Sequence, residues 1–406
     1  MPKSGGAVIP MPLNFNDLQF VIGSADRAAA MSLLKPLPPF ADEVIEFLNA
    51  LSKELMKKSR GFSDVATFAF WCRKPALLQE KKSYDDLASR LGRGVIFHST
   101  PSNVAVNFAF SFAAGLLAGN ANIVRLPGKE FAQVDMICAV INELLQQDFQ
   151  NLAPYVCMVK YPPHKEISDA FSALCNGRVV WGGDETIARM RLSPLPPRAV
   201  EITFADRHSL LVINAEAYLQ ADNKERLAQD FYNDTYLSDQ NACTSPRIII
   251  WLGNKTETAR EIFWQKLHLL LKDKYNLAPV QAVGKLSAFY KAAAEKPLRL
   301  CASPDNLIMR LELERLDEDL MDYKYNSGFF FEYQAENLAE ILPLASVKCQ
   351  TLTYFGLEKE QLAEFFKTVR PHGIDRAVPM GKSMDFTLVW DGYDLIRELS
   401  RKISIL

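Results

Sequence analysis

The sequence predicts an α/β protein of two domains, each with a mainly parallel β-sheet. Short runs rich in β-branched residues alternate with helical patterns of apolar residues, and this alternation is typical of β-α-β units. The chain has 406 residues, of which 49% are hydrophobic and 23% are charged, so it can bury two separate cores. We therefore expect two α/β domains rather than one.

The first domain is predicted to span residues 1–220 and to begin with a helical cap. Residues 41–60 place apolar side chains at helical spacing and charged side chains on the opposite face. Beyond this cap, strands are predicted at residues 94–98, 121–126, 156–161, 178–181, 200–204 and 209–213. Helices are predicted to begin at residues 103, 130, 164 and 184, and a further helix is predicted at residues 215–232.

The second domain is predicted over residues 221–372. Its strands are expected at residues 247–252, 328–332 and 350–355. Its helices are expected at residues 256–274, 335–342 and 358–369, with an irregular stretch from the end of the first of these to residue 322. Residues 373–406 end in a strand that turns into a helix, and we expect this segment to return to the first domain.

Charge and cysteine content exclude several classes of protein. A net charge of -2 gives no electrostatic reason to expect nucleic acid or an anionic membrane as the main partner. The longest apolar stretch, residues 104–119, falls short of the roughly 20 residues that a membrane span requires. Pro10 and Pro12 interrupt the apolar residues that a signal peptide would need. The seven cysteines are scattered and none has zinc spacing, so we expect a cytoplasmic protein without structural disulfides or a metal.

Cys243 is the strongest candidate for a catalytic residue. It stands among the small polar residues 239–247, directly before the apolar run 248–252. A cysteine at such a loop-to-strand junction can expose its sulfur and direct its backbone N–H toward the group that the sulfur attacks, as covalent acyl transfer requires. The other six cysteines lie in apolar periodic contexts and are expected to be small buried hydrophobes: Cys72, Cys138, Cys157, Cys175, Cys301 and Cys349.

Asn103 and the histidines are the other residues with which Cys243 could work. Asn103 stands at the start of an apolar helix, where it can cap the helix or, beside Cys243, donate to an oxyanion. A cysteine–histidine hydrolase would need a histidine as general base. His268 lies in a helical pattern and is expected to be structural, whereas His98 and His208 lie near strand ends and stay open as candidates.

Two further motifs suit a nucleotide. Arg125, Gly128 and Lys129 follow the strand at residues 121–126, at the edge of an open parallel sheet where ligands bind. The motif of Gly182, Gly183 and Asp184 places a glycine pair between a strand and a helix N-terminus, which favours a phosphate. A solvated loop and ordinary turn chemistry explain the same residues, and no G-x-G-x-x-G or Walker motif is present.

Taken together, these motifs resemble those of the aldehyde dehydrogenase superfamily in their order and spacing. Within it the chain is most similar to the acyl-CoA reductases of the LuxC type, whose best-known members supply fatty aldehyde for bacterial bioluminescence. The resemblance begins near residue 90 and includes residues 101–103, 119–125, 181–184, 373–379 and 390–394 as well as the Cys243 loop. It implies an aldehyde dehydrogenase-like α/β fold, with two Rossmann-like parallel-sheet domains and a cleft between them.

The resemblance also implies roles for individual residues. Cys243 matches the nucleophile of the family, and Asn103 matches the side-chain oxyanion donor. Arg125 matches the position of a ribose-binding lysine. Gly128 stands where NAD-specific members tend to place a carboxylate on the ribose 2′-hydroxyl, and with Lys129 beside it the resemblance implies that NADPH is accepted.

Two carboxylates depart from the family pattern. Glu201 lies near the general-base glutamate of classical members, but the Glu-Leu-Gly-Gly-Lys signature is replaced by Glu-Ile-Thr-Phe. Glu332 is a candidate for the distal ribose-binding carboxylate. A strong water-activating base would hydrolyse an acyl-enzyme, so the missing signature fits a reductase better than an aldehyde oxidiser.

The function that the resemblance implies is NADPH-dependent reduction of an acyl thioester to the aldehyde, through an acyl-enzyme on Cys243. The acyl donor is CoA or a carrier protein, and the acyl group is by analogy fatty. Three alternatives stay open: an aldehyde dehydrogenase that uses Glu201 as base, a cysteine acyltransferase or thioesterase without nucleotide, and a catalytically silent scaffold. By the same analogy we expect self-association and an acyl-activating protein partner.

Overall fold

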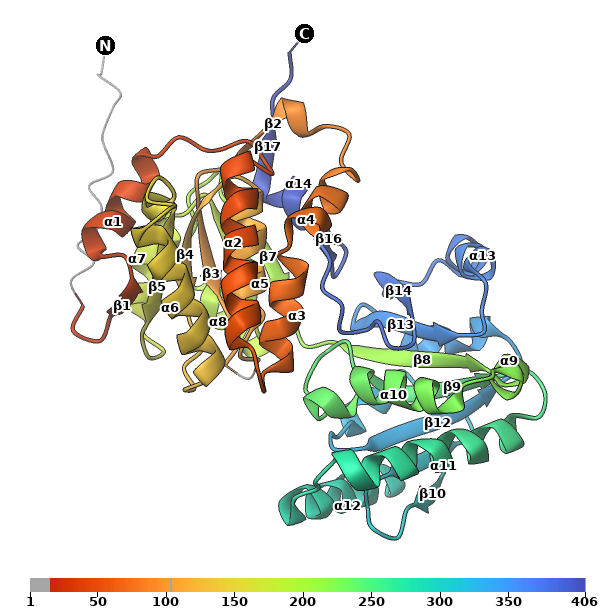
Figure 1. Cartoon of the computed structure of the whole chain (residues 1–406). Helices are drawn as coiled ribbons and strands as arrows, with labels where there is room; N and C mark the ends of the chain where they lie inside the picture. Colours follow the sequence, from red (N-terminus) through yellow and green to blue (C-terminus); the bar gives the residue numbers. More distant parts are fainter. Residues whose placement is uncertain (1–14, 103, 406) are drawn as a thin grey trace. The chain divides into compact units, whose positions relative to one another are not determined.

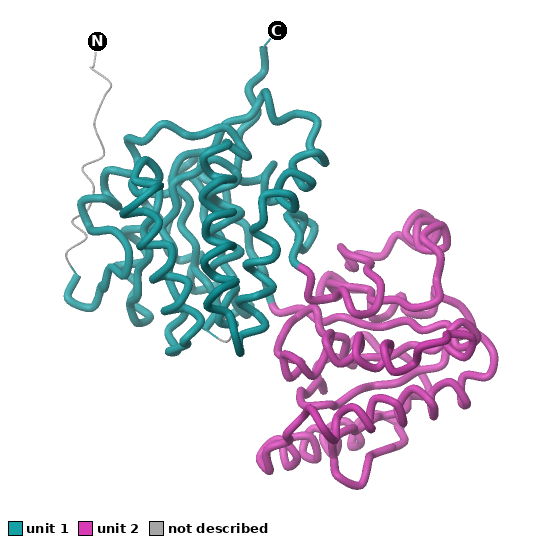
Figure 2. The backbone as a smooth tube through the Cα atoms, in the orientation of Figure 1, with its two compact units in different colours: residues 1–205, 386–406 teal, residues 206–385 magenta. Residues whose placement is uncertain are grey.

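The structure is a computed structural model, and it describes residues 15–102 and 104–405. The chain divides into two compact units, residues 1–205 with 386–406 (unit 1) and residues 206–385 (unit 2), so unit 2 is inserted into the sequence of unit 1 (Figure 2). The sequence pattern places the boundaries at residues 220 and 372 instead. The first difference arises because the strand over residues 208–214 pairs within the sheet of unit 2.

Unit 1 is built on a six-stranded sheet with the order β1-β5-β4-β3-β6-β7. The strands β3 to β7 are parallel, and β1 runs antiparallel to β5 (Figure 1). Their bounds are β1 (Gln19–Ile22), β3 (Val95–Ser99), β4 (Ala121–Arg125), β5 (Val156–Lys160), β6 (Gly177–Trp181) and β7 (Val200–Phe204). The chain adds strands outward from β3 through β4 to β5, and then crosses to the other side of β3 to add β6 and β7.

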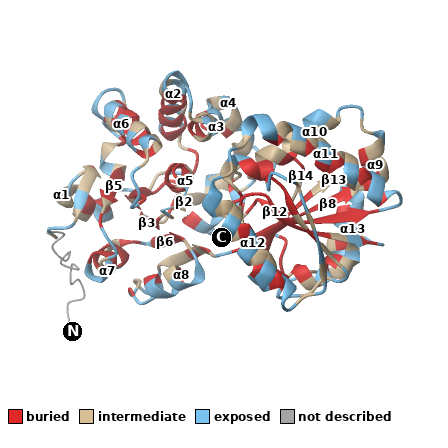
Figure 3. Ribbon diagram, turned by 90° about the horizontal axis from the view of Figure 1, so that it is seen from below, coloured by how far each residue is buried: buried red, intermediate tan, exposed pale blue. Residues whose placement is uncertain are grey.

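Helices cover both faces of this sheet because its strands are apolar on both sides. Along β3, Ile96 packs into one core, whereas Val95 and Phe97 pack into the other. Figure 3 shows the strands of this sheet largely buried, with helices on either side. The first core is covered by α2 (Asp42–Lys58), α3 (Ser63–Trp71), α4 (Lys74–Lys81), α5 (Asn107–Leu117) and α6 (Ala132–Gln146). The second is covered by α1 (Ala25–Ala30), α7 (Lys165–Leu174) and α8 (Asp184–Arg191). The helix expected from residue 103 begins at Asn107.

The segment after residue 385 completes unit 1. It contains β15 (Val389–Trp390), β16 (Tyr393–Asp394), α14 (Leu395–Leu399) and β17 (Ser400–Lys402), and β17 pairs antiparallel with β2 (Arg90–Gly92). Leu395, Ile396 and Leu399 are buried in the first core. The buried Asn120 donates to the carbonyl of Leu399 at 2.9 Å, which ties α14 to the start of β4.

Unit 2 is built on a seven-stranded sheet with the order β10-β11-β12-β9-β8-β13-β14. All neighbours are parallel except β10 and β11. The strands are β8 (His208–Asn214), β9 (Pro246–Leu252), β10 (Leu298–Ala302), β11 (Met309–Leu313), β12 (Phe329–Ala335), β13 (Cys349–Phe355) and β14 (Arg376–Pro379). One face is covered by α9 (Ala215–Gln220), α10 (Lys224–Asp234) and α11 (Thr256–Lys274), and the other by α12 (Pro279–Ala293) and α13 (Lys359–Val369).

Three predicted elements of unit 2 differ in the structure. The helix predicted at residues 215–232 is interrupted, because Asn223 accepts from the backbone N–H of Arg226 and starts a new helix there. The stretch predicted to be irregular contains α12, β10 and β11. The helix predicted at residues 335–342 is a 3-10 helix, Leu338–Leu344, which contains Pro343. In the described part of the chain, no helix is both long and apolar enough to cross a membrane.

Candidate active site around Cys243

Cys243 lies in a loop at the amino ends of the unit 2 strands. The loop joins the 3-10 helix Tyr236–Ser238 to β9. Because β8, β9, β12 and β13 are parallel neighbours, their amino ends meet at one edge of the sheet, and the loop lies at that edge. Cys243 is partly exposed, as a nucleophile needs to be.

Five of the other six cysteines are buried, as expected: Cys72, Cys138, Cys157, Cys175 and Cys349. Burial raises the pKa of Cys138, Cys157, Cys175 and Cys349 to about 12, which makes these thiols poor nucleophiles. Cys301 corrects the expectation, because it is partly exposed. It lies on β10, an edge strand on which every residue is partly or fully exposed.

Gln350 and Ser209 both form hydrogen bonds to Cys243. They lie on β13 and β8, the two strands that follow β9 in the order of the sheet. Gln350 is the second residue of β13, is buried, and donates from Nε2 to the sulfur of Cys243 at 3.4 Å. The Ser209 hydroxyl on β8 donates to the backbone carbonyl of Cys243 at 2.7 Å. An N–H directed at the sulfur favours the thiolate over the thiol. Sequence reasoning missed both residues, although each stands at the first or second position of a predicted strand in the same parallel sheet.

Gln240 and Asp239 fix the shape of the loop. Both have left-handed backbone, with φ of 52° and 49°, a conformation that is uncommon for residues other than glycine. Gln240 is fully buried, and its Oε1 accepts the N–H groups of Gly328 at 2.8 Å and Phe329 at 3.3 Å. The carboxylate of Asp239 accepts from Ser327, Gln281 and Tyr275. These bonds tie the cysteine loop to the start of β12 and compensate for the unfavourable backbone.

Arg247 adds a buried positive charge beside the loop. Its guanidinium donates to the carbonyls of Gln240 at 2.5 Å and Tyr325 at 2.8 Å, and to Oδ1 of Asn326 at 2.8 Å. Burial lowers the pKa of Arg247. Electrostatic attraction to Asp206, Cys243 and Asp239 raises it and so opposes part of this shift. Because the interaction with Cys243 is mutual, the guanidinium favours a thiolate at that position.

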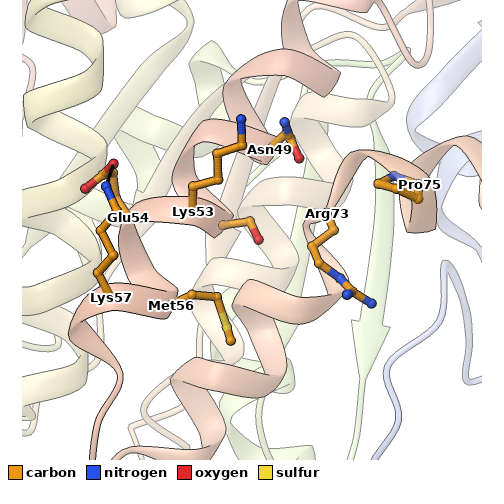
Figure 4. Close-up of a pocket in the computed structure, with 8 residues that line it drawn as sticks. Asn49, Lys53, Glu54, Met56, Lys57, Arg73 and Pro75 are labelled. Atoms are coloured by element: carbon orange, nitrogen blue, oxygen red, sulfur yellow. Dashed lines mark hydrogen bonds and ion pairs between the residues drawn. The ribbon is translucent and has the colours of Figure 1, made fainter.

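A hollow of about 310 Å³ adjoins this loop within unit 2. It is lined by Asp239, Arg247, Gln281, Lys324, Tyr325, Asn326 and Ser327. A second hollow, of about 480 Å³, lies in unit 1, and its lining residues come from α2 and the start of α4 (Figure 4). Figure 4 shows the Glu54–Lys57 ion pair at its side, with Arg73 opposite. None of the residues predicted for catalysis or nucleotide binding lines this second hollow.

The glycine pair predicted to bind phosphate lies at the crossover point of the unit 1 sheet. Strand order reverses between β3 and β6, and in open α/β sheets ligands bind outside the carboxyl ends of the strands at such a point. Gly182 and Gly183 follow β6 directly, and α8 begins at Asp184 without a side-chain cap. A Cβ at Gly183 would meet nothing within 4 Å, so the backbone there is open to a ligand.

The second predicted nucleotide segment lies at the carboxyl end of β4, which neighbours β3. The Arg125 guanidinium stacks 4.3 Å from the ring centre of Tyr161 and donates to the Tyr161 carbonyl at 3.2 Å. Gly128 and Lys129 are exposed, and a Cβ at Gly128 would meet nothing within 4 Å. Both predicted nucleotide segments therefore lie at the same edge of one sheet. Asn103, the predicted oxyanion donor, lies outside the described residues.

Glu201 is held in an ion-paired cluster on β7. Its Oε2 accepts from Nε of the buried Arg178 at 2.8 Å, and its Oε1 accepts from Arg191 at 2.9 Å. Arg178 stands directly opposite Glu201 on the neighbouring strand β6. Glu201 therefore compensates a buried guanidinium, a structural task that competes with a role as a free base.

Glu332 corrects an expectation, because it is not available to a ribose. Its side chain has 0% exposure, and both carboxylate oxygens are occupied. Oε1 accepts from Trp251 at 3.0 Å and from Trp264 at 2.6 Å, while Oε2 pairs with Arg260 and Arg310. The carboxylate lies on β12 and cross-links the unit 2 core.

His98 and His208 are buried and neutral. Both ring nitrogens of His98 are engaged, Nδ1 with Ser111 at 2.8 Å and Nε2 with Asn122 at 2.9 Å. Nε2 of His208 lies 3.4 Å from the carbonyl of Leu344. Burial lowers the pKa of each ring to about 4, which makes both histidines weak bases at neutral pH.

These two histidines predict a loss of stability in acid. A folded-state pKa of about 4 lies below the ordinary value of 6.5, so the unfolded chain takes up protons first as the pH falls. Their contribution is complete above pH 6.5 and is lost between there and pH 4, by about 2 kcal/mol per histidine at pH 5. Urea unfolding at pH 7 and pH 5 measures the difference. The difference in unfolding free energy between the two pH values should be smaller in His98→Gln. An unchanged difference would contradict the lowered pKa of His98.

Comparison with solved structures identifies the class of fold. The chain is similar to a glyceraldehyde-3-phosphate dehydrogenase from Methanocaldococcus jannaschii complexed with NADP, with a TM-score of 0.65, 13% identity, and coverage of 93% of this chain and 91% of that one. It is similar to a salicylaldehyde dehydrogenase from Pseudomonas putida, with a TM-score of 0.64, 14% identity, and coverage of 93% and 86%. The two mainly parallel sheets therefore form an aldehyde dehydrogenase-like α/β fold, as predicted.

Sequence comparison then places the chain within that class. Residues 33–296 match the acyl-CoA reductase (LuxC) family, and the chain belongs to this family. It is also 22% identical over 333 residues to a long-chain acyl-protein thioester reductase of Photorhabdus laumondii. That match covers 77% of this chain and 63% of the length of the Photorhabdus protein.

Proposed function

We propose that the protein reduces an acyl thioester to the aldehyde with NADPH, through a covalent acyl-enzyme on Cys243. The observation that carries this proposal is the partly exposed Cys243 in a member of the acyl-CoA reductase family. Its sulfur accepts a hydrogen bond from Gln350, and buried hydrogen bonds fix its loop. The name of the Photorhabdus relative supports a long acyl chain and a protein-bound thioester. An acyl-CoA is the other donor that we propose.

The residues of unit 1 fit a nicotinamide dinucleotide. The order β5-β4-β3-β6-β7 is that of a dinucleotide-binding sheet, and Gly182 and Gly183 stand at its crossover point. The uncapped start of α8 suits a phosphate, and Arg125 and Lys129 stand at the same sheet edge. No carboxylate stands at Gly128 to repel a 2′-phosphate, so we propose NADPH over NADH. When bound, NADPH supplies the hydride that converts the thioester into a hemithioacetal.

The chain's own residues account for the other steps. The Cys243 thiolate, favoured by the Gln350 amide and the Arg247 charge, attacks the thioester carbonyl, and the donor thiol departs. Asn103 is proposed to donate to the oxyanion, a contribution of about 3 kcal/mol to the transition state. After reduction, Cys243 leaves the hemithioacetal as a thiolate, and the aldehyde is released.

The direct test is to incubate the protein with a panel of acyl-CoAs and NADPH. Aldehyde formation together with an acyl mass increment on Cys243 supports the proposal, whereas free acid without aldehyde contradicts it. NADPH binding by the purified protein separates the proposal from an acyltransferase or thioesterase that needs no nucleotide. A Cys243 that does not react with iodoacetamide would instead indicate a silent scaffold. We further propose self-association, which light scattering of the purified protein measures.

Glu201→Gln tests the rival activity, oxidation of an aldehyde to the acid. If Glu201 were the water-activating base, the change would abolish thioester hydrolysis. We expect it to leave hydrolysis and reduction unchanged and to lower the unfolding free energy by about 3 kcal/mol, because Arg178 stays buried without its counter-charge. The matched control is Glu185→Gln on the exposed side of α8, expected to change stability by less than about 0.5 kcal/mol. Loss of hydrolysis in Glu201→Gln alone would favour the oxidiser.

A further inference from the structure

Asp234 is a buried carboxylate that binds a distant turn of unit 2. It is the last residue of α10, and its side chain has no solvent exposure. Oδ2 accepts the backbone N–H of Gly381 at 2.6 Å, and Oδ1 accepts that of Ser383 at 3.0 Å. The ionised carboxylate therefore satisfies two N–H groups of the turn at residues 380–385.

Arg376 holds the carbonyl groups of the same turn. From β14, its guanidinium donates to the carbonyls of Ser383 at 2.8 Å, Lys382 at 3.1 Å and Asp385 at 2.5 Å. Gly381 has a φ of +89°, and a Cβ there would lie 2.8 Å from the Cβ of Asp230 on α10. The turn is thus held by an acidic side chain on its N–H groups and a basic side chain on its carbonyls.

This turn reaches the cysteine loop through Met384. The Thr244 hydroxyl donates to the sulfur of Met384 at 3.3 Å. Thr244 is buried and follows Cys243 directly in the loop. A continuous set of contacts within unit 2 therefore runs from Asp234 through the turn and Met384 to the residue next to the nucleophile.

We propose that Asp234 is a positioning residue for Cys243, because its ionised carboxylate holds the turn at residues 380–385 and so fixes Met384 against Thr244. The inference rests on the proposed function only in taking Cys243 as the nucleophile. It assigns Asp234 no contact with substrate or cofactor.

The ionisation of Asp234 makes this arrangement sensitive to pH. Burial raises its pKa to about 6, against the lowering effect of the Gly381 and Ser383 hydrogen bonds, and Asp230 adds to the increase. The charged groups packed around it are Asp230 on α10, paired with Arg226, Lys382 on the turn, paired with Asp385, and Arg376 on β14. Below about pH 6 one carboxylate oxygen becomes a hydroxyl, which is a poorer acceptor, and the turn loosens.

The test measures how fast iodoacetamide alkylates Cys243 in the full chain, by peptide mass spectrometry, between about pH 5 and pH 8. Wild type should show a step near the pKa of Asp234 in addition to the titration of the thiol. Asp234→Asn should lose this step. Its rate of Cys243 alkylation at pH 8 should differ from that of wild type by on the order of tenfold, because the thiol is misplaced. Asp230→Asn should move the step to lower pH, because it removes a neighbouring negative charge while both N–H bonds remain.

Met384→Ala keeps the test decisive if Asp234→Asn does not fold. It should remove the step while Asp234 itself is untouched, and a step that persists in Met384→Ala would overturn the inference. An unmoved step in Asp230→Asn would overturn it as well. Aldehyde formation is assayed in parallel: wild type that makes no aldehyde but shows the expected steps contradicts the proposed function and leaves this inference standing.

Discussion

Cys243→Ser is expected to lower aldehyde formation by more than about a thousandfold, because a serine hydroxyl without an adjacent base is a far weaker nucleophile toward a thioester. The acyl mass increment should disappear with the activity. NADPH binding should be retained, because the residues proposed to hold it, Gly182 and Gly183 among them, lie in unit 1, whereas Cys243 lies in unit 2. The measurement is single-turnover aldehyde formation together with intact-protein mass spectrometry.

Cys301→Ser is the matched control for this prediction. Cys301 is the other partly exposed thiol among the described residues, but it lies on the outer strand β10 and approaches Glu312 at 3.4 Å. Burial and Glu312 both raise its pKa, so it is a poor nucleophile. Activity should therefore stay within about twofold of wild type, as is usual for a surface substitution. If Cys301→Ser lost activity while Cys243→Ser retained it, Cys301 would be the nucleophile and the prediction would be wrong.

Glu332→Gln is expected to cause the largest loss of stability, about 3 to 5 kcal/mol in unfolding free energy. The carboxylate is fully buried and accepts from two tryptophan N–H groups while pairing with Arg260 and Arg310. A neutral amide leaves Arg310 without its counter-charge, removes one of the two carboxylates that pair with Arg260, and turns an N–H₂ toward at least one donor. Urea unfolding followed by tryptophan fluorescence measures the change, and Trp251 and Trp264 lie at the site.

The control for Glu332→Gln uses the same arginine. Glu312 also pairs with Arg260, at 2.5 Å, but its side chain is 17% exposed, so water can replace part of the interaction. Glu312→Gln is expected to cost about 1 kcal/mol. Equal losses of unfolding free energy in the two variants would show that burial of the Glu332 carboxylate does not increase its contribution to stability.

The sequence predicts most strands of both sheets correctly, because a buried parallel strand is a continuous apolar run that can be recognised locally. It cannot decide which sheet such a run joins. β8 follows β7 after only three residues and looks like part of the first domain, but its pairing with β9 and β13 places it in unit 2. Likewise α12 lacks a strong apolar stripe, since of its side chains only Lys285 and Ala292 are buried.

The candidate site divides in the same way. Cys243 and the glycine pair are recognisable because their chemistry depends on immediate neighbours in the sequence. Gln350 and Asp234 are not recognisable, because their partners lie 107 and about 150 residues away along the chain. In the sequence, Glu201 is a candidate for a general base and Glu332 for a ribose-binding carboxylate, and only the folded chain shows the arginines that pair with them.

The insertion of unit 2 into unit 1 has a consequence for biosynthesis. When residue 385 leaves the ribosome, unit 2 is complete, whereas unit 1 still lacks α14 and β17, whose side chains and backbone close its core and pair with β2. The nascent part of unit 1 therefore exposes apolar surface while unit 2 folds. A released chain that is truncated after residue 385 should bind a hydrophobic dye and resist proteolysis in the insert alone.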